Sequence, residues 1–429
     1  MTRLNQTITR WQGMGLIATT LLGTGVFILP QLTLAAAGSQ AIWAWVLLLA
    51  AILPLTYVFA ELGRHYTHAA GPAYFTERAF GSVTGRVAGL TFLFAIPPGT
   101  TAALIMTFEF LRPLVELTSG QRLTIELAAF AGLFFLNRRG LQISGKIQLI
   151  LTLTIVAVVL AMLLAAFTAP QGTLSTQAPI SSQTLQQTDS AIAGHGGLMA
   201  AIALAVWSFL GIEAVTDLAG EFKDVKQDFI PASLGGVTLV GLIYIACTWL
   251  STLVPEHSLA MVGAFELLIG DSGRWIIGLL GLISGLATVN VYFASTARLA
   301  WSFSQEGVLP NQLTQLNKHQ VPSTALLSFI LISAAILVIS HFSQLDFVAL
   351  AHWVNGCFVM IYTLSMLAAW KLLSKRHRPA IAIGLLACAL FVISLGSAMA
   401  YAMILAAVIV PLLHLQKSWK NRNLADVSK

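Results

Sequence analysis

The stretch GTGVF, residues 23–27, lies in the middle of the first long apolar run of the chain, residues 13–37. Its two glycines, Gly23 and Gly25, flank Thr24 and weaken a helix at a depth where a bilayer offers no water to freed backbone groups. Amides freed at the start of an outer half-helix would present a positive dipole end to a small anion. The alternative is a packing role, because small residues at this spacing also let neighbouring helices approach closely in membranes.

The composition places the chain among membrane proteins. Of its 429 residues, 57% are hydrophobic and only 9% are charged, which is typical of a polytopic membrane protein. Apolar runs of about 20 residues span a bilayer. Such runs are predicted at residues 13–37, 41–62, 86–111, 122–136, 147–168, 196–220, 231–254, 274–300, 322–341, 346–370, 380–397 and 399–415. The sequence therefore predicts an all-α polytopic membrane protein with twelve transmembrane helices.

The basic residues orient the predicted helices. If the N-terminus is cytoplasmic, most Lys and Arg residues fall in inner segments, and only Arg112, Arg122 and Arg274 fall outside. This asymmetry follows the positive-inside rule and predicts that both termini are cytoplasmic. The net charge of +6 is therefore interpreted as a topology signal, and binding of nucleic acid has little support.

Other protein classes are disfavoured. The first run is interpreted as a retained helix and not as a cleaved signal peptide, because its apolar stretch exceeds about 7–15 residues and contains Pro30. Cys247, Cys357 and Cys388 all fall in predicted spans, so neither a disulfide framework nor a metal site is predicted. No spaced cluster of His, Cys or acidic residues indicates an enzyme, and no cofactor is expected.

A second break is predicted in the sixth run, where the chain reads WSFLGIE at residues 207–213. Gly211 and Glu213 lie near the midpoint of residues 195–221. A charged side chain at that depth costs about 2.5–3.5 kcal/mol on insertion scales, so Glu213 is expected to face protein or water. Glu213 is then either a functional group or a structural carboxylic acid that is hydrogen-bonded between helices.

The spacing of the two breaks predicts an inverted repeat. They lie five helices apart, and an odd number of helices between equivalent positions inserts the second set upside down relative to the first. Interrupted helices at corresponding positions of inverted repeats point to the central site of a transporter. The predicted organisation is a cytoplasmic N-terminus at 1–12, a first repeat at 13–168, an outer loop at 169–195, a second repeat at 196–370, two C-terminal helices at 371–415 and a cytoplasmic tail at 416–429.

Two further positions are candidates for gating. Pro97 and Pro98 predict a kink in the third helix, which either relieves packing or lines the same cavity as Thr24. Asn290 in the eighth helix either hydrogen-bonds to another helix or lines the cavity.

Several motifs follow one another between residues 13 and 310. They are GTGVF in helix 1, AAGPAYF and AFG in the second inner loop, NRRG before helix 5, FLGIE in helix 6, EFKDVKQDF after it and ARLAWSFSQEGVLP leaving helix 8. In this order they resemble the motifs of the amino acid-polyamine-organocation (APC) transporters, whose fold is a LeuT-like five-plus-five inverted repeat. The chain looks most like the bacterial exporters of L-methionine and branched-chain amino acids.

The resemblance implies residue roles. The backbone amides of residues 23–25 would bind the substrate carboxylate, aided by the Thr24 hydroxyl. Carbonyls around Trp207, Phe209 and Leu210 would hold the α-ammonium, and the two aromatic rings would form an apolar wall and gate. The implied substrate-binding residues are Gly23, Thr24, Gly25, Trp207, Phe209, Leu210, Gly211 and Ile212, and the coupling or gating residues are Glu213, Trp207, Pro98 and Asn290.

The chain departs from the family pattern at two places. Many members carry a helix 5 lysine in the place of a sodium ion, and the matching position here is Ile155. The loop after helix 6 usually reads Asn-Pro where this chain has Asp224-Val225. Proton coupling through a lysine at that position is therefore not expected, and gating at that loop is expected to differ in detail from the family pattern.

The sequence as a whole predicts a secondary transporter of small neutral hydrophobic amino acids, namely methionine, leucine, isoleucine and valine. We expect an exporter that works by proton antiport and alternating access in the bacterial inner membrane, with the amino acid, protons and the lipid bilayer as its partners. Apolar candidates and one plausible buried carboxylate favour a neutral substrate. One alternative is a cationic amino acid or polyamine antiporter that uses Glu213 and Asp217. Another is a non-transporting membrane sensor, and the oligomeric state is not predicted.

Overall fold

The computed structural model describes residues 8–66, 71–140, 145–169, 196–214, 216, 219, 222–254 and 259–427. Nearly all of these residues are helical, and the described part contains no strand beyond an isolated bridge between Ile8 and Phe222. Asp217 and almost all of the outer loop expected at 169–195 lie outside the described residues.

The elements follow the predicted apolar runs. The first half contains α1 (Arg10–Leu22), the 3-10 turn η1 (Thr24–Phe27), α2 (Leu29–Ala37), η2 (Gly38–Gln40), α3 (Ala41–His65), α4 (Gly71–Phe80), α5 (Ser82–Glu109), α6 (Ser119–Arg138) and α7 (Gly145–Thr168). The second half contains α9 (Gly197–Ala205), η3 (Val206–Phe209), η4 (Ile212–Ala214), α11 (Phe229–Ser251), α12 (Ala260–Leu268), α13 (Gly273–Gln305), η6 (Asn311–Thr314), α14 (Ser323–Ser343), α15 (Phe347–Leu372), η7 (Lys375–His377), α16 (Arg378–Leu395), η8 (Gly396–Met399) and α17 (Ala400–Val427).

Both predicted helix breaks are confirmed. The first run is divided where α1 ends at Leu22, directly before Gly23, and α2 begins at Leu29 with Pro30 in its first turn. Proline is tolerated there because the first amides of a helix have no intrahelical partner. The sixth run is divided after α9, where Leu210 is extended and Gly211 has a φ of +111°. A left-handed φ of this kind favours glycine.

The number of spans is only partly tested. Every predicted run contains helix, and eight helical stretches among the described residues are long and apolar enough to cross a membrane. Two of the eight, Leu29–His65 and Lys375–Gln416, each contain helices from two predicted runs, whereas α6 and α9 are not among them. Twelve spans and the inverted repeat therefore stay predictions.

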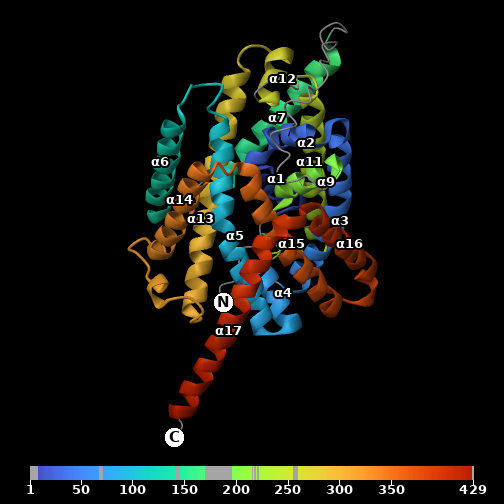
Figure 1. The fold of residues 1–429 in the computed structure, drawn as a ribbon. Coiled ribbons are helices and arrows are strands. Elements are labelled where there is room, and N and C mark those ends of the chain that lie inside the picture. Colours follow the sequence, from blue (N-terminus) through green and yellow to red (C-terminus); the bar gives the residue numbers. More distant parts are fainter. Residues whose placement is uncertain are drawn as a thin grey trace.

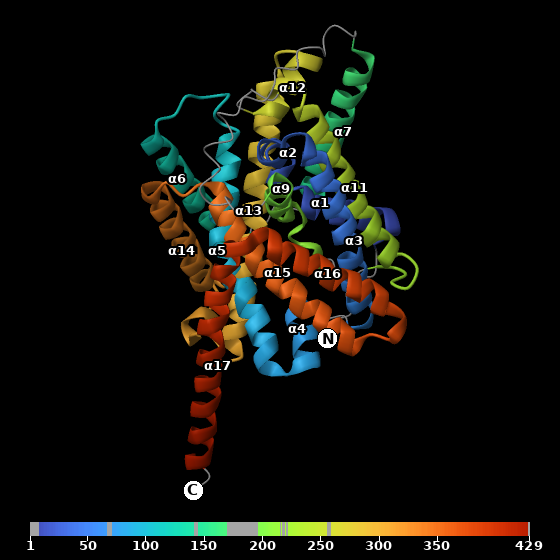
Figure 2. The ribbon, with the colours of Figure 1, turned by 45° about the vertical axis from the view of Figure 1, so that its right-hand side comes forward.

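The helices form an upright bundle in which α5 is central. Figures 1 and 2 show α4 and the far end of α17 at one end of the bundle and α12 at the other, and we call these the α4 end and the α12 end. The helix α5 packs against α4, α13, α14, α15 and α17. Between α3 and α5, the helix α4 packs against α5 and α15.

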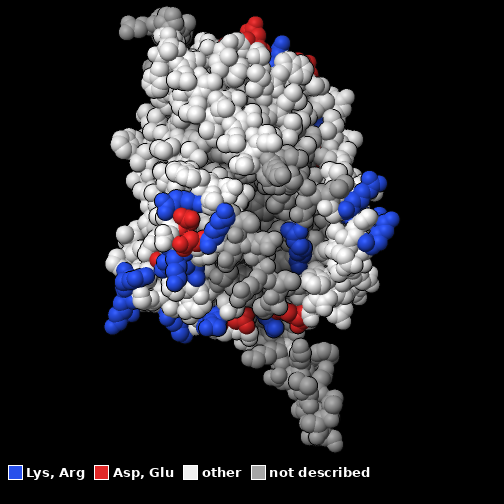
Figure 3. Space-filling view, turned by 180° about the vertical axis from the view of Figure 1, so that it is seen from behind, with Lys and Arg blue, Asp and Glu red and all other residues white. Residues whose placement is uncertain are grey.

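The surface is that of a multi-pass membrane protein. Helices on the outside of the bundle expose large apolar side chains, among them Leu164 and Phe167 on α7 and Phe342 on α14. Figure 3 shows that Lys and Arg gather in the half nearer the α4 end, below a broad area that is almost free of charge. Contiguous exposed apolar surface of this extent would be costly in water and is expected against lipid.

Candidate functional site at the helix breaks

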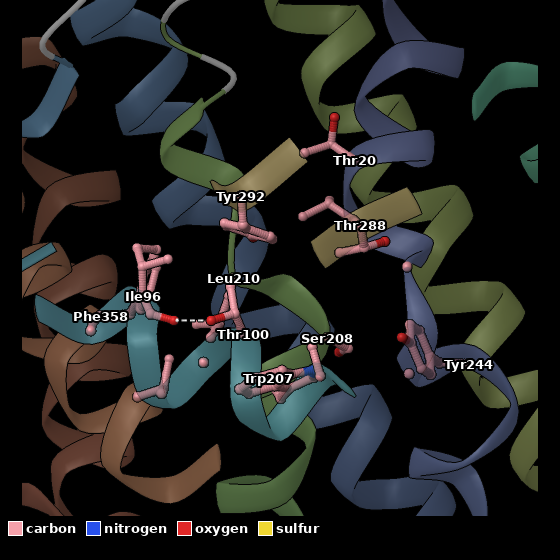
Figure 4. A pocket seen from close by; sticks show the side chains of 17 residues that line it. Thr20, Ile96, Thr100, Trp207, Ser208, Leu210, Tyr244, Thr288, Tyr292 and Phe358 are labelled. Carbon is pink, nitrogen blue, oxygen red and sulfur yellow. Dashed lines mark hydrogen bonds between the residues drawn. The ribbon is translucent and has the colours of Figure 1, made fainter. Parts of the chain in front are cut away.

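A cavity lies where the two broken helices meet. Its empty volume is about 570 Å³, including the part that opens to solvent. Gly23 and Gly25 line it from the first break, and Trp207, Ser208 and Leu210 line it from the second. The remaining wall comes from α1, α5, α11, α13 and α15, at Thr20, Leu21, Ala95, Ile96, Gly99, Thr100, Ala103, Tyr244, Thr288, Tyr292, Val354 and Phe358 (Figure 4).

Among the residues that the structure describes, no Asp, Glu, Lys, Arg or His side chain lines the cavity. Its polar side chains carry hydroxyl groups, and several of these already donate hydrogen bonds within their own helix. Thr20, Thr100 and Thr288 donate to carbonyl oxygens one turn earlier, at 3.0 Å in each case. Within the described part of the chain, the hydroxyls of Tyr244 and Tyr292 have no partner, so these two groups remain available to a bound molecule.

Glycine is required at position 25 because neighbouring side chains pack closely against its backbone, and not because of its backbone angles. A Cβ atom at this position would lie 2.8 Å from the Tyr244 hydroxyl oxygen and 2.7 Å from Leu29 Cδ1. Contacts of that length force neighbouring atoms to move. The absence of a side chain therefore lets Tyr244 reach the backbone of the first break, beside the cavity.

Glu213 lies behind the cavity wall and accepts a hydrogen bond from the backbone of the second break. Its side chain is 5% exposed, and its Oε2 accepts hydrogen bonds from the Tyr362 hydroxyl at 2.7 Å and from the Gly211 amide at 3.1 Å. No Lys or Arg forms an ion pair with it among the described residues. Because Gly211 follows Leu210, which lines the cavity, Glu213 connects α15 to the wall of the site.

Trp207 closes the cavity on one side. Its ring meets that of Phe347 edge-on, with 5.5 Å between ring centroids and an angle of 83° between planes. On the other side, Thr20 is exposed although it lines the cavity, whereas Ser208 and Leu210 are buried. The open side of the cavity thus lies toward α1, and its closed side lies toward the start of α15.

The structure brings only some of the predicted site residues to the cavity. Gly23, Gly25, Trp207 and Leu210 line it. Phe209, Gly211 and Ile212 are buried at the same break but are not in its wall. The Thr24 side chain lies outside the described residues, so the predicted role of its hydroxyl stays a prediction.

Pro98 and Asn290 are not in the wall. The helix α5 continues through both prolines, and its neighbouring residues line the cavity. Proline has no amide to donate to the carbonyl four residues earlier, and the Tyr401 hydroxyl of α17 instead donates to that oxygen, on Phe94, at 3.0 Å. Asn290 is buried and accepts a hydrogen bond from the amide of Asn137, which joins α13 to α6.

Four aromatic residues of the site were missed by sequence reasoning: Tyr244, Tyr292, Phe358 and Tyr362. Each lies inside an apolar run, and three carry a hydroxyl that a bilayer would leave without a partner. That feature is the only signal that the sequence offers for them. Among the described residues, no group of His, Cys, Asp and Glu has an arrangement that could hold a metal ion.

Comparisons with known proteins agree with this geometry. The amino acid permease family matches residues 8–423 of the chain. The L-methionine/branched-chain amino acid exporter YjeH of Escherichia coli (strain K12) is 35% identical over 98% of this chain and 99% of its own length. An uncharacterized amino acid permease, YecA of Bacillus subtilis (strain 168), is 26% identical over 94% of each chain. The cadaverine/lysine antiporter of Escherichia coli (strain K12) is 25% identical over 73% of this chain and 70% of its own length.

The fold also matches a solved structure. A Na+-coupled sialic acid symporter in a substrate-bound outward-open state is similar with a TM-score of 0.56, over 92% of this chain and 91% of that chain. Its sequence identity is 14%, so the likeness shows the fold alone. That fold is the LeuT-like helical bundle expected from the sequence.

Proposed function

Because the chain belongs to the amino acid permease family of the APC superfamily, we propose that it transports small neutral amino acids with apolar side chains. Methionine, leucine, isoleucine and valine are the proposed substrates. The observation that carries this proposal is that none of the described residues that line the cavity at the two breaks has a charged side chain. A buried cationic side chain would need an acidic partner, and an apolar one would not.

The backbone of the two breaks supplies the groups for the rest of the substrate. We assign the carboxylate to the amides of residues 23–25, at the start of the outer half of helix 1, and the α-ammonium to carbonyls of η3. Helix dipoles favour these signs of charge at these ends. The free hydroxyl of Tyr244 stands beside Gly25 and would donate to the same carboxylate.

The apolar side chain of the substrate would lie between Trp207, Phe358 and Val354, which line the cavity from η3 and α15. In this proposal the Trp207 and Phe347 rings are the barrier that opens when the substrate leaves toward the α12 end.

Export by proton antiport is proposed through Glu213. A proton on this carboxyl group would remove its charge and weaken its hold on the Gly211 amide, which lies next to Leu210 in the cavity wall. Binding at the break and protonation of Glu213 would then influence each other, as coupled transport requires. The name of the relative YjeH, an exporter, supports this direction.

We place the protein in a bacterial inner membrane with twelve spans, two inverted repeats and both termini in the cytoplasm. The gathering of Lys and Arg toward the α4 end supports this orientation (Figure 3). The cavity then opens to the cytoplasm and is closed to the outside by Trp207, which is one state of an alternating-access cycle.

The deciding experiment is flux in proteoliposomes that contain the purified protein. We expect uptake of radiolabelled methionine and leucine that increases with an imposed pH gradient and is not reduced by excess lysine or cadaverine. Transport of lysine or cadaverine without methionine would instead favour the activity named for the more distant relative. No flux of any of these compounds from folded protein would favour a sensing role.

A further inference from the structure

A cluster of titratable side chains lies at the α4 end, where it joins the last two turns of α3 to η7, the short turn between α15 and α16. Its members are Tyr57, Glu61, Arg64, His65, Arg376 and His377, and we call it the inner cluster. None of these residues lines the cavity at the helix breaks. Glu61 and His377 are each only 3% exposed, so the inner cluster buries two groups that can change their charge.

The hydrogen bonds of the inner cluster determine the form of the His377 ring. Arg376 Nε lies 2.8 Å from Nε2 of this ring. A guanidinium group can only donate hydrogen bonds, so Nε2 accepts this one and carries no proton. The ring hydrogen is therefore on Nδ1, which donates to the Tyr57 hydroxyl at 3.0 Å. This arrangement requires a neutral imidazole.

The series of hydrogen bonds ends at Glu61. The Tyr57 hydroxyl donates to Glu61 Oε1 at 3.3 Å, and Arg64 lies 2.7 Å from Oε2 of the same carboxyl group. All three hydrogen bonds thus point the same way, from Arg376 through His377 and Tyr57 toward the carboxyl group. The middle one crosses between the two segments and holds the end of α3 against η7.

The charges around His377 oppose a second proton on its ring. The charged and titratable groups that face it are Tyr57, Glu61, Arg64 and His65 from α3 and Arg376 from its own turn. Glu61 lies 3.9 Å from Nδ1, but this carboxyl group is already paired with Arg64. A proton on His377 therefore adds positive charge where the two arginines already outnumber the single carboxylate.

Protonation of His377 would break the series at its first bond. With a proton on Nε2, two donors and two positive charges would face each other across 2.8 Å, so Arg376 would withdraw. The bonded arrangement is therefore stable above the pH range in which His377 protonates, and it is lost as the pH falls through that range. Histidine is the side chain that ordinarily titrates between about pH 5 and 8.

Both segments that the inner cluster joins also reach the second helix break. On α3, Gly63 lies so close to the chain after this break that a Cβ atom there would be 3.0 Å from Thr216 Cα. The helix α15, which leads into η7, carries the Tyr362 hydroxyl that donates to Glu213. A change in the fit of α3 against η7 is therefore passed to the break from two sides.

We propose that the inner cluster is a regulatory proton site, separate from the coupling group Glu213. One proton, taken up by His377 from the compartment at the α4 end, releases Arg376 and disfavours the state in which the cavity is open toward α1. Transport then slows as that compartment becomes acidic. The inference goes beyond the proposed function, because it concerns which state the protein occupies and not which molecule it carries.

The test is the rate at which a maleimide labels Thr20→Cys in the purified full chain in lipid nanodiscs. Thr20 is exposed on the open side of the cavity, so labelling reports the open state without any substrate. The native thiols, which belong to Cys247, Cys357 and Cys388, are buried. Each rate is measured at about pH 7.5 and about pH 5.5, on either side of the ordinary titration of histidine.

His377→Gln, made in the same background, is the deciding variant. Its amide can accept from Arg376 and donate to Tyr57, but it cannot take up a proton. Because both proteins carry the same reporter thiol, the ratio of their rates cancels the effect of pH on the thiol itself. We expect similar rates at about pH 7.5, and at about pH 5.5 a rate about threefold or more lower when His377 is present.

His65→Gln is the matched control. This histidine also belongs to the inner cluster, but its side chain is 46% exposed and its Nδ1 contacts the backbone oxygen of Glu61 at 2.9 Å. It takes no part in the series from Arg376 to Glu61. The variant should therefore retain the full pH response of labelling.

Tyr57→Phe provides an independent measurement, which also decides the question if His377→Gln does not fold. It removes the acceptor of the Nδ1 hydrogen and so destabilises the neutral ring of His377. The midpoint of the labelling response should then move to higher pH. An unchanged midpoint, or one at lower pH, contradicts the proposal.

The regulatory site and the proposed function fail in different experiments. A pH response of labelling that is equal with His377 and with His377→Gln, or that disappears in His65→Gln instead, would overturn the regulatory site and leave methionine transport standing. Absence of methionine flux from folded wild-type protein would overturn the proposed function, and the labelling result would not depend on it.

Discussion

Gly25→Ala adds a single methyl group beside the first helix break, and its effect can be worked out from the surrounding contacts. The new Cβ would lie 2.8 Å from the Tyr244 hydroxyl oxygen, whereas ordinary contact begins at 3.4 Å, so this hydroxyl must withdraw by about 0.6 Å. Leu29 Cδ1, at 2.7 Å, must also move. Overpacking of this kind costs about 1–3 kcal/mol.

We expect this free-energy cost to lower the affinity for the substrate. Tyr244 lines the cavity, and its relaxation displaces the hydroxyl that is proposed to meet the substrate carboxylate. If the whole 1–3 kcal/mol is lost from binding, the methionine dissociation constant rises about 5- to 150-fold. Equilibrium binding in lipid nanodiscs measures this constant, and flux in proteoliposomes should decline in parallel.

Gly99→Ala is the matched control. It adds the same methyl group to the same cavity, but its Cβ would meet the Val354 methyls at 3.6 Å, which is ordinary contact. Because alanine also favours the helix α5, folding should not suffer, and we expect methionine affinity to change by less than about threefold. The reasoning is refuted if folded Gly25→Ala binds methionine like the wild type, or if Gly99→Ala loses as much affinity.

Three further predictions concern proton coupling and the proline site. Glu213→Gln keeps a side chain of the same shape that can accept the same hydrogen bonds, but it cannot take up the coupled proton. The ratio of methionine flux with a pH gradient to flux without one should therefore fall to about one. A retained response to the gradient would show that Glu213 does not carry the coupled proton. Tyr362→Phe deletes the 2.7 Å hydrogen bond to Glu213 and should shift the pH profile of flux, and an unchanged profile would separate Tyr362 from coupling. Tyr401→Phe leaves the Phe94 carbonyl without its donor and should lower stability by about 1–3 kcal/mol in thermal unfolding, while an unchanged melting curve would show that another group takes its place.

The sequence was sufficient to predict the features that a lipid bilayer imposes on the chain. Every predicted apolar run contains helix, although α4 and α12 lie between the runs. The glycines of GTGVF and of FLGIE marked both breaks, because membrane-embedded helices rarely lose backbone hydrogen bonds without a purpose. The structure confirms both breaks and shows Gly23, Gly25, Trp207 and Leu210 around one cavity. These residues lie on the broken segments themselves, where local sequence determines local structure.

The rest of the site depends on which helix faces touch, and one sequence does not give that information. Tyr244 and Tyr362 come from α11 and α15, and apart from their hydroxyl groups nothing in their own runs distinguishes them from lipid-facing aromatic residues. Asn290 was open to two interpretations, and the structure places it against Asn137 and away from the cavity wall.

Ile155 is the position at which the resemblance predicts a helix 5 lysine, and its apolar side chain limits which residues can carry a coupled proton. Ile155 is fully apolar and buried in α7, which packs against α1, so no charge can appear or disappear at that position. Glu213 is the carboxyl group that directly hydrogen-bonds to a residue of a helix break among the described residues, through the Gly211 amide. Two other buried carboxyl groups, Glu61 and Glu126, are paired with Arg64 and Arg122 and lie outside the wall at the breaks. A proton that is to influence the substrate site therefore has its shortest structural connection through Glu213, and this is why the Glu213→Gln flux ratio is the measurement that decides the coupling mechanism.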